Sequence, residues 1–168
     1  VVHTGYPVFA DSAVDAGVDG LLTVDIPPEE GASLNAELQR VGMDKIFLIA
    51  PTTPSRRIEL IPAEASGFIY YVSLKGVTGA GHLDVADVAH HIGLIRESSE
   101  LPVAVGFGIK DAESAAAVAG IADGVVVGSA LINAMAAQLE AGGDYDQVQA
   151  AAVELLAEIR AGVDSAAS

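Results

Sequence analysis

The fold is decided by residues 101–130, which read LPVAVGFGIKDAESAAAVAGIADGVVVGSA. Two apolar runs, 101–107 and 122–128, meet glycine at their ends, and a segment with helical periodicity follows each of them. The runs are apolar at successive positions, as is required of a strand that is covered on both faces. This stretch therefore predicts two consecutive strand–helix units of a parallel α/β sheet.

The same alternation extends toward the N-terminus. The predicted strands are 1–5, 19–25, 45–50, 68–73, 101–107 and 122–128. The predicted helices are 9–16, 29–41, 54–64, 84–97, 111–119, 129–141 and 145–161. The phrases AGVDG at 16–20 and AGIADG at 119–124 each end a helix at glycine and place an aspartate before a strand. A βα unit repeated in this way is typical of a β/α barrel.

Composition excludes several classes of protein. The 168 residues carry 8 basic and 23 acidic side chains, a net charge of -15, which disfavours binding to nucleic acid or to anionic lipid. The absence of cysteine excludes disulfides, a thiol nucleophile and a Cys-ligated metal. The four histidines lack metal-ligand spacing, and no run is apolar for long enough to span a membrane. We expect one domain over 1–168, without a metal.

Two glycine-marked strand ends carry the strongest chemical signal. They read Gly106-Phe107-Gly108-Ile109 and Gly128-Ser129-Ala130. Glycine allows close backbone approach and the first amides of a helix favour an anion, so two adjacent turns can hold one phosphate. Barrel enzymes place that site after strands seven and eight. On this count the run 1–5 is strand three and the first two strands are missing, although both turns can also be ordinary caps.

The loop SLKGVTGA at 73–80 suits a lid over such a site. Gly79 could add a backbone contact to the phosphate, whereas Lys75 is either a phosphate-attracting or a solvated charge. Thr78 either orients a catalytic carboxylate or satisfies its own loop. Asp25, at the end of a predicted strand, is either an acid–base residue or a helix-start residue.

With these motifs in view, the chain closely resembles the alpha subunit of tryptophan synthase. The matching stretches are GVDGLLTVDIPPEE (17–30), IFLIAPTTPSRRI (46–58), GFIYYVSLKGVTGA (67–80), LPVAVGFGIKDAESA (101–115) and ADGVVVGSALI (122–132). The resemblance implies a TIM (β/α)8 barrel of the ribulose-phosphate-binding type. It also implies a cytoplasmic lyase of tryptophan biosynthesis that cleaves indole-3-glycerol phosphate to indole and glyceraldehyde 3-phosphate. Indole then passes to a beta subunit, within an alpha2-beta2 heterotetramer, that carries the pyridoxal phosphate; the alpha subunit itself needs no cofactor.

The resemblance also implies roles for individual residues. The phosphate-binding positions are Gly79, Gly108, Gly128 and Ser129. The positions at the indole pocket are Phe107, Tyr70, Leu22, Leu48 and Tyr6. Thr78 matches the lid threonine that positions the catalytic aspartate, and Asp25 and Pro27 fall in a loop on the face where the beta subunit docks.

Two departures keep other functions open. The family's catalytic glutamate and aspartate lie in a segment like G-x-P-x-S-D-P followed by D-G, which does not occur in these residues, so no catalytic residue is assigned. At Tyr6-Pro7-Val8 the family has a longer loop. The alternatives are a non-catalytic subunit that binds a phosphate ligand and activates a partner, and another phosphate-binding barrel isomerase, which should lack the GVTGA loop.

Overall fold

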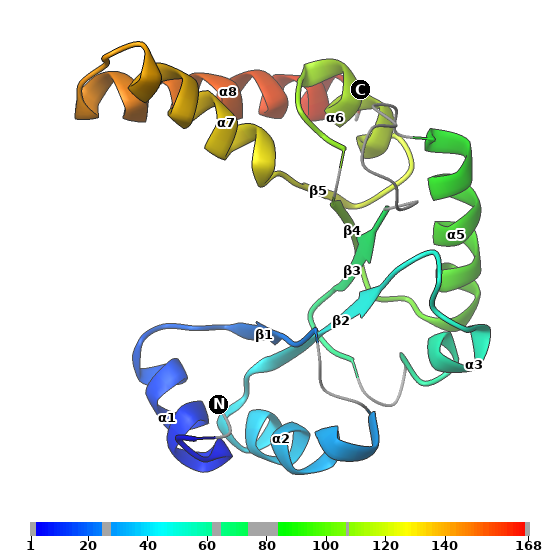
Figure 1. The fold of residues 1–168 in the computed structure, drawn as a ribbon. Helices are drawn as coiled ribbons and strands as arrows, with labels where there is room; N and C mark the ends of the chain where they lie inside the picture. Colours follow the sequence, from blue (N-terminus) through cyan, green and yellow to red (C-terminus); the bar gives the residue numbers. More distant parts are fainter. Residues whose placement is uncertain (1–2, 25–27, 62–64, 74–83, 107, 167–168) are drawn as a thin grey trace.

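The computed structural model describes residues 3–24, 28–61, 65–73, 84–106 and 108–166. These residues form a parallel sheet whose strands follow one another in chain order (Figure 1). The strands are β1 (Gly20–Leu22), β2 (Asp44–Ile49), β3 (Ile69–Val72), β4 (Val103–Gly106) and β5 (Gly124–Val126). The helices are α1 (Tyr6–Asp15), α2 (Pro28–Val41), α3 (Ser55–Ile58), α5 (Val85–Ser98), α6 (Ala112–Ala119), α7 (Ser129–Glu140) and α8 (Tyr145–Ala166).

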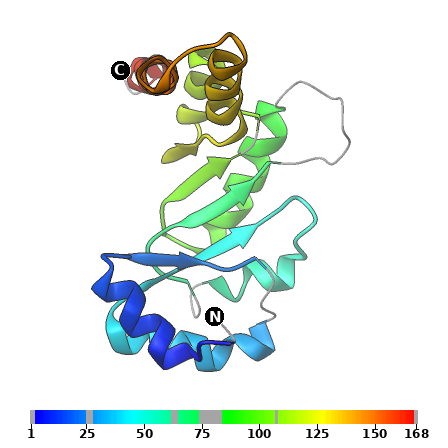
Figure 2. The ribbon, with the colours of Figure 1, turned by 60° about the vertical axis from the view of Figure 1, so that its left-hand side comes forward.

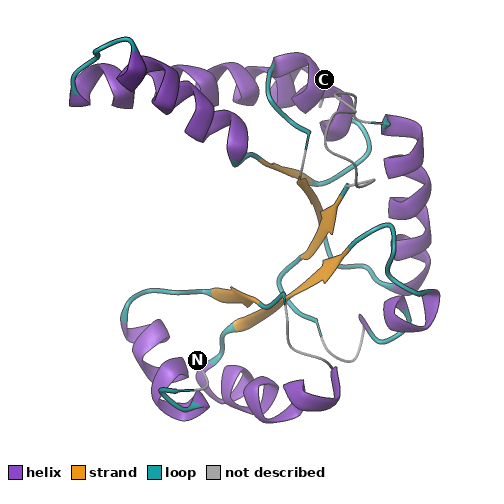
Figure 3. Cartoon of the chain, in the orientation of Figure 1, coloured by secondary structure: helices purple, strands orange, loops and turns teal. Residues whose placement is uncertain are grey.

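The helices lie on the outer side of a curved sheet. The strands line the inner side of an arc, with α1 and α2 at one end and α6 to α8 at the other (Figure 3). Turned by 60°, the molecule shows the strands in unbroken order from β1 to β5 (Figure 2). A doubly wound sheet would reverse its strand order and carry helices on both faces. Sequential parallel strands with helices outside are instead the wall of a β/α barrel.

Alternation within each strand separates two environments. In β3, Ile69 and Tyr71 are fully buried, whereas Tyr70 and Val72 are only half-buried. The buried set faces α5, since Ile69 and Tyr71 share one apolar cluster with Val88, Ile92 and Ile95. The half-buried set therefore faces the concave side of the arc.

A repeated aspartate occupies equivalent positions at the amino ends of the strands. The backbone carbonyl of Asp19, just before β1, accepts from the Asp44 amide of β2 at 2.8 Å. Asp123, just before β5, donates its amide to the Val103 carbonyl of β4 at 2.9 Å. The Asp123 carboxylate accepts from the Val103 amide at 2.9 Å and from Arg96 at 3.2 Å. Both phrases thus place an aspartate directly before a strand, but they end their helices differently, with φ of +84° at Gly17 and -69° at Gly120.

The predicted strand at 1–5 is wrong for the residues that can be checked. His3 and Thr4 form a turn, Gly5 has φ of +82° and caps α1, and Val1 and Val2 lie outside the described residues. Pro7 stands in the first turn of α1, where its fixed φ and missing N–H are compatible with a helix. Helix α1 therefore begins at Tyr6, directly after this turn.

The predicted helix 54–64 is interrupted. Ser55–Ile58 forms the helix α3, a turn follows at Glu59 and Leu60, Ile61 is helical again, and 62–64 lie outside the described residues. Helix α3 borders a cavity beside β2 through Arg57.

Candidate functional site

The carboxyl ends of the strands meet at one edge of the sheet, because all five run in parallel. Ser73, the residue after β3, ties two of these ends together. Its amide and its hydroxyl both donate to the Gly106 carbonyl, at 3.1 and 3.0 Å. The loops after β3 and β4 therefore start from a fixed common point.

The two glycine turns leave this edge from neighbouring strands. Gly106 is the register partner of Val126, and Gly108 and Gly128 each lie two residues further along their strands. Both glycines are exposed, and the φ of Gly108 is +81°, a conformation that L side chains rarely adopt. Both turns thus leave the same edge of the sheet from neighbouring strands and are open to solvent.

The first backbone amides of helix α7 lie in the turn that follows β5. The Gly128 carbonyl accepts the Ile132 amide at 3.2 Å, so helix geometry leaves the amides of residues 129–131 without intrahelical acceptors. Gly128, rather than Ser129, is the N-cap, and Ser129 is the exposed first helical residue and makes no capping hydrogen bond. A Cβ added at Gly128 would meet no atom within 4 Å. Free amides facing open space favour an anion.

An apolar wall adjoins these turns on the concave face. Leu48 of β2 is the register partner of Tyr70 of β3, and Leu22 of β1 pairs with Ile46, which lies on the same face as Leu48. Leu22, Leu48 and Tyr70 are all half-buried. The Tyr70 side chain reaches β4, where its hydroxyl takes the place that a Cβ of Gly106 would occupy. These side chains form an apolar surface on the concave face of the sheet.

Comparisons with known proteins decide the family. The family model described as tryptophan synthase alpha chain matches residues 1–162. The chain belongs to this family. It is 49% identical over 164 residues to the tryptophan synthase alpha chain of Thiobacillus denitrificans, covering 98% of this chain and 58% of that protein. It is 54% identical to that of Thioalkalivibrio sulfidiphilus, covering 95% of this chain and 59% of that protein.

Solved structures confirm the fold prediction. Tryptophan synthase subunit alpha from Legionella pneumophila superposes with a TM-score of 0.83 at 40% identity, over 98% of this chain and 59% of that one. Tryptophan synthase from Mycobacterium tuberculosis, in its aminoacrylate-bound form, gives a TM-score of 0.78 at 31% identity, over 97% and 58%. The chain thus spans somewhat over half the length of these relatives. Its five strands form part of a tryptophan synthase alpha TIM barrel.

The residues that the family resemblance singles out fall into four groups. Gly108, Gly128 and Ser129 lie at the glycine turns, and Leu22, Leu48 and Tyr70 share the concave face. Tyr6 is not brought to them: it packs against the cluster of Leu34, Leu38 and Met43, which also receives Leu21 from the helix side of β1. Outside the described residues lie Asp25, Pro27, Thr78, Gly79 and Phe107.

The structure also decides between the two adjacent tyrosines of β3. Tyr71 faces the helices, where its ring stacks on His91 at 5.6 Å between centroids. Burial, and next the negative charge of Asp87, raises the pKa of Tyr71 to about 12. His90 is exposed, whereas His91 is half-buried and contacts the Asp87 carbonyl at 2.9 Å. Tyr70 is therefore the tyrosine available to a ligand on the concave face.

Two kinds of feature are absent from the described part of the chain. Within it, no group of three or more His, Asp or Glu side chains is placed to hold a metal ion. Likewise none of its helices combines the length and apolarity needed to cross a membrane.

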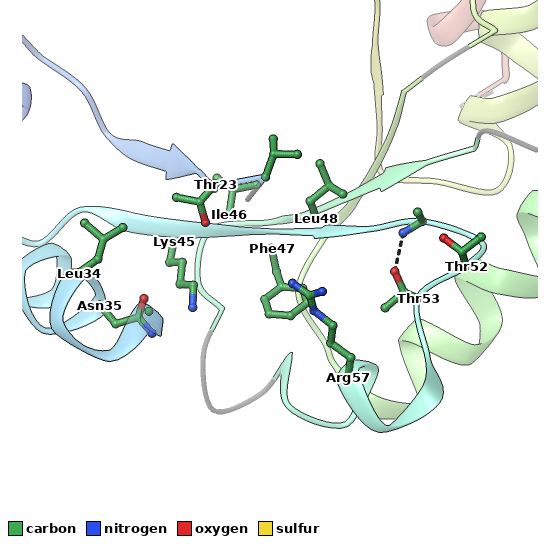
Figure 4. Close-up of a pocket in the computed structure, with 13 residues that line it drawn as sticks. Thr23, Leu34, Asn35, Lys45, Ile46, Phe47, Leu48, Thr52, Thr53 and Arg57 are labelled. Atoms are coloured by element: carbon green, nitrogen blue, oxygen red, sulfur yellow. Dashed lines mark hydrogen bonds between the residues drawn. The ribbon is translucent and has the colours of Figure 1, made fainter. Parts of the chain in front are cut away.

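A cavity on the helix side of β2 was not anticipated from the sequence (Figure 4). It has a volume of about 220 Å³ and lies between α2, β2 and α3. Asn35, Lys45 and Arg57 reach it from these three elements. They share no motif and are far apart in the sequence, so only the fold reveals their proximity.

Proposed function

We propose that the protein acts as a tryptophan synthase alpha chain, a carbon–carbon lyase that cleaves indole-3-glycerol phosphate to indole and glyceraldehyde 3-phosphate. Family membership supports the proposal. The observation that carries it is the placement of two solvent-open glycine turns after neighbouring strands, on a sheet whose concave face carries apolar side chains. A phosphorylated substrate with a flat aromatic end needs both features.

In this proposal each half of the substrate has its own place. The amides around Gly108, Gly128 and Ser129 bind the phosphate, with Gly79 of the lid as a further contact. The indole rests on Leu22, Leu48 and Tyr70, with Phe107 as a further position implied by the family. The substrate is then held at both ends, so its orientation is fixed before the reaction.

The reaction itself needs two proton transfers. A proton added at indole C3 and a proton removed from the adjacent glycerol hydroxyl let the bond between that ring carbon and the side chain break. The bonding electrons return to the ring, and the side chain leaves as the aldehyde. Positioned carboxylates perform such transfers. The family's catalytic carboxylate segment does not occur in residues 1–168, so we assign no catalytic residue here and give Thr78 a supporting role only.

The proposal includes a partner and a location. The partner is a tryptophan synthase beta subunit in an alpha2-beta2 complex, contacted near Asp25 and Pro27, which accepts indole and carries the pyridoxal phosphate. The alpha chain works as one barrel domain without a cofactor, in the cytoplasm. The alternative is a non-catalytic subunit that binds the same phosphate ligand and activates its partner.

Calorimetric titration with indole propanol phosphate, an uncleavable analogue, tests the binding half of the proposal. Gly128→Asp places a carboxylate at the anion site and should lower affinity at least about tenfold, since it opposes charge with like charge. Gly93→Asp adds the same group at an exposed glycine of α5 and should leave affinity unchanged. Equal affinity of all three proteins would refute the assignment. Release of glyceraldehyde 3-phosphate with the beta subunit present then separates the lyase from the non-catalytic alternative.

A further inference from the structure

Ser73 makes a hydrogen bond that the pairing of β3 with β4 does not itself require. Val72 is the register partner of Gly106, and the Ser73 amide donates to the Gly106 carbonyl at 3.1 Å, which extends the parallel ladder. The Ser73 hydroxyl donates to the same carbonyl at 3.0 Å. A carbonyl oxygen has two lone pairs, so one residue supplies donors for both. The side chain of Ser73 therefore holds one particular peptide group at the carboxyl-terminal edge of the sheet.

Gly106 is also held at its α-carbon and by the residue before it. The Tyr70 side chain lies where a Cβ of Gly106 would be, so it packs directly on the glycine backbone. Val105 is fully buried against the helices. Gly106 therefore marks the last position of β4 that is fixed on several sides before the chain enters the exposed turn.

The orientation of Gly108 depends on this fixed point. Gly108 lies two residues beyond Gly106, is exposed, and has φ of +81°. Consecutive Cα atoms are only about 3.8 Å apart, so a tilt of the Gly106 peptide group is passed on to the Gly108 amide. A hydrogen bond weakens steeply when its donor is misdirected. The strength of a bond from Gly108 to a phosphate therefore depends on how firmly Gly106 is held.

We propose that Ser73 is a positioning residue for the phosphate end of the substrate. Its hydroxyl fixes the Gly106 peptide group, and Gly106 fixes the direction of the Gly108 amide; Ser73 acts through them rather than by contact with the substrate. Donors that are oriented before binding lose less freedom when the anion arrives, so they bind it more tightly. The inference rests on the proposed function, and it adds a residue of β3 to a site built from the turns after β4 and β5.

The test compares variants of Ser73 in calorimetric titrations with indole propanol phosphate. Ser73→Ala should lower affinity about 2- to 10-fold, as expected for the loss of one hydrogen bond between neutral groups. Ser73→Thr keeps a hydroxyl and should restore the affinity of the parent, whereas Ser73→Cys, a weaker donor, should fall between them. Affinity for indole alone, which lacks the phosphate, should be the same in all of these proteins. In the ligand-free ¹⁵N spectrum the Gly108 amide signal should move in Ser73→Ala and return in Ser73→Thr.

The matched control lies at the other end of β3. Ser66 is half-buried like Ser73, and its hydroxyl oxygen accepts from the Lys45 amide of β2 at 3.0 Å. Ser66→Ala thus removes the same kind of bond at the amino-terminal edge of the sheet and should leave affinity unchanged.

The outcomes separate the role of Ser73 from the proposed function. If the parent binds the analogue and Ser73→Ala binds it equally well, the role of Ser73 is refuted and the proposed function stands. If Ser66→Ala weakens binding as much as Ser73→Ala, the effect is a general loss of stability and the role of Ser73 is likewise overturned. If the parent does not bind the analogue, the proposed function fails and this inference fails with it.

Discussion

Gly162 is the tightest packing point between α8 and α6, and replacing it with alanine should destabilise the protein. A Cβ at this position would lie 2.8 Å from Ala112 Cα and 2.9 Å from its carbonyl carbon, where ordinary contacts begin at 3.4 Å. These are backbone atoms, so they cannot rotate away. The helices must separate by several tenths of an ångström around the buried side chain of Ile159.

Two opposing effects set the size of the change. Alanine favours a helix over glycine by about 1 kcal/mol, whereas overpacking costs about 1–3 kcal/mol, here at the upper end because backbone is displaced. We expect Gly162→Ala to lower the free energy of unfolding by about 1–2 kcal/mol. Gly93→Ala in α5 meets no atom within 4 Å and should raise that free energy by up to about 1 kcal/mol.

Urea unfolding of both variants beside the parent measures the difference. The packing argument requires shifts of opposite sign at an unchanged slope. If Gly162→Ala proved as stable as Gly93→Ala, helix propensity would dominate and the close packing of α6 on α8 would be refuted.

Three further predictions concern single side chains. The hydrogen bond from the Val103 amide lowers the pKa of Asp123, so the carboxylate stabilises the fold above about pH 4 and does so less as the pH falls further. Asp123→Asn should therefore lower the free energy of unfolding, measured in urea, by about 1 kcal/mol at pH 7 and leave it unchanged in acid. Tyr71→Phe removes a buried hydroxyl that has no partner among the described residues, so the thermal unfolding midpoint should stay the same or rise. In an absorbance titration, the parent protein should show one tyrosine that ionises near pH 12, and the variant should lack it. Gly106→Ala would bring a Cβ within 2.7 Å of the Tyr70 ring, so it should destabilise the fold. A double-mutant cycle should show that this loss of unfolding free energy is smaller by at least about 0.5 kcal/mol when Tyr70 is also replaced by alanine.

Much of the barrel wall is predictable from local pattern. Unbroken apolar runs identify strands that are covered on both sides. Asp111 caps helix α6, and its carboxylate accepts from the Ser114 amide at 2.9 Å, as is typical of aspartate at the start of a helix. The strand prediction fails at residues 3–5, where His3 and Thr4 form a turn. Gly5 and Pro7 begin a helix immediately instead.

The candidate site also contains some features that the local sequence predicts and others that it does not. The glycine turns can be predicted from the sequence because some turn conformations strongly favour glycine. Gly108 is an example, with φ of +81°. Which of Tyr70 and Tyr71 faces the concave side depends on strand register, and the register becomes known only from the neighbouring strands. The cavity at Arg57 depends on three distant segments and on the shortness of α3, which no local pattern encodes.

The central claim is that the turns after β4 and β5 bind one phosphate together. Titration of the ¹⁵N-labelled chain with indole propanol phosphate tests it most directly, through the backbone amides of Gly108 and Ser129. The account predicts that both amide signals move and that the two shifts fit one dissociation constant, because a single group contacts both turns. Movement of only one signal, or two different constants, would contradict it.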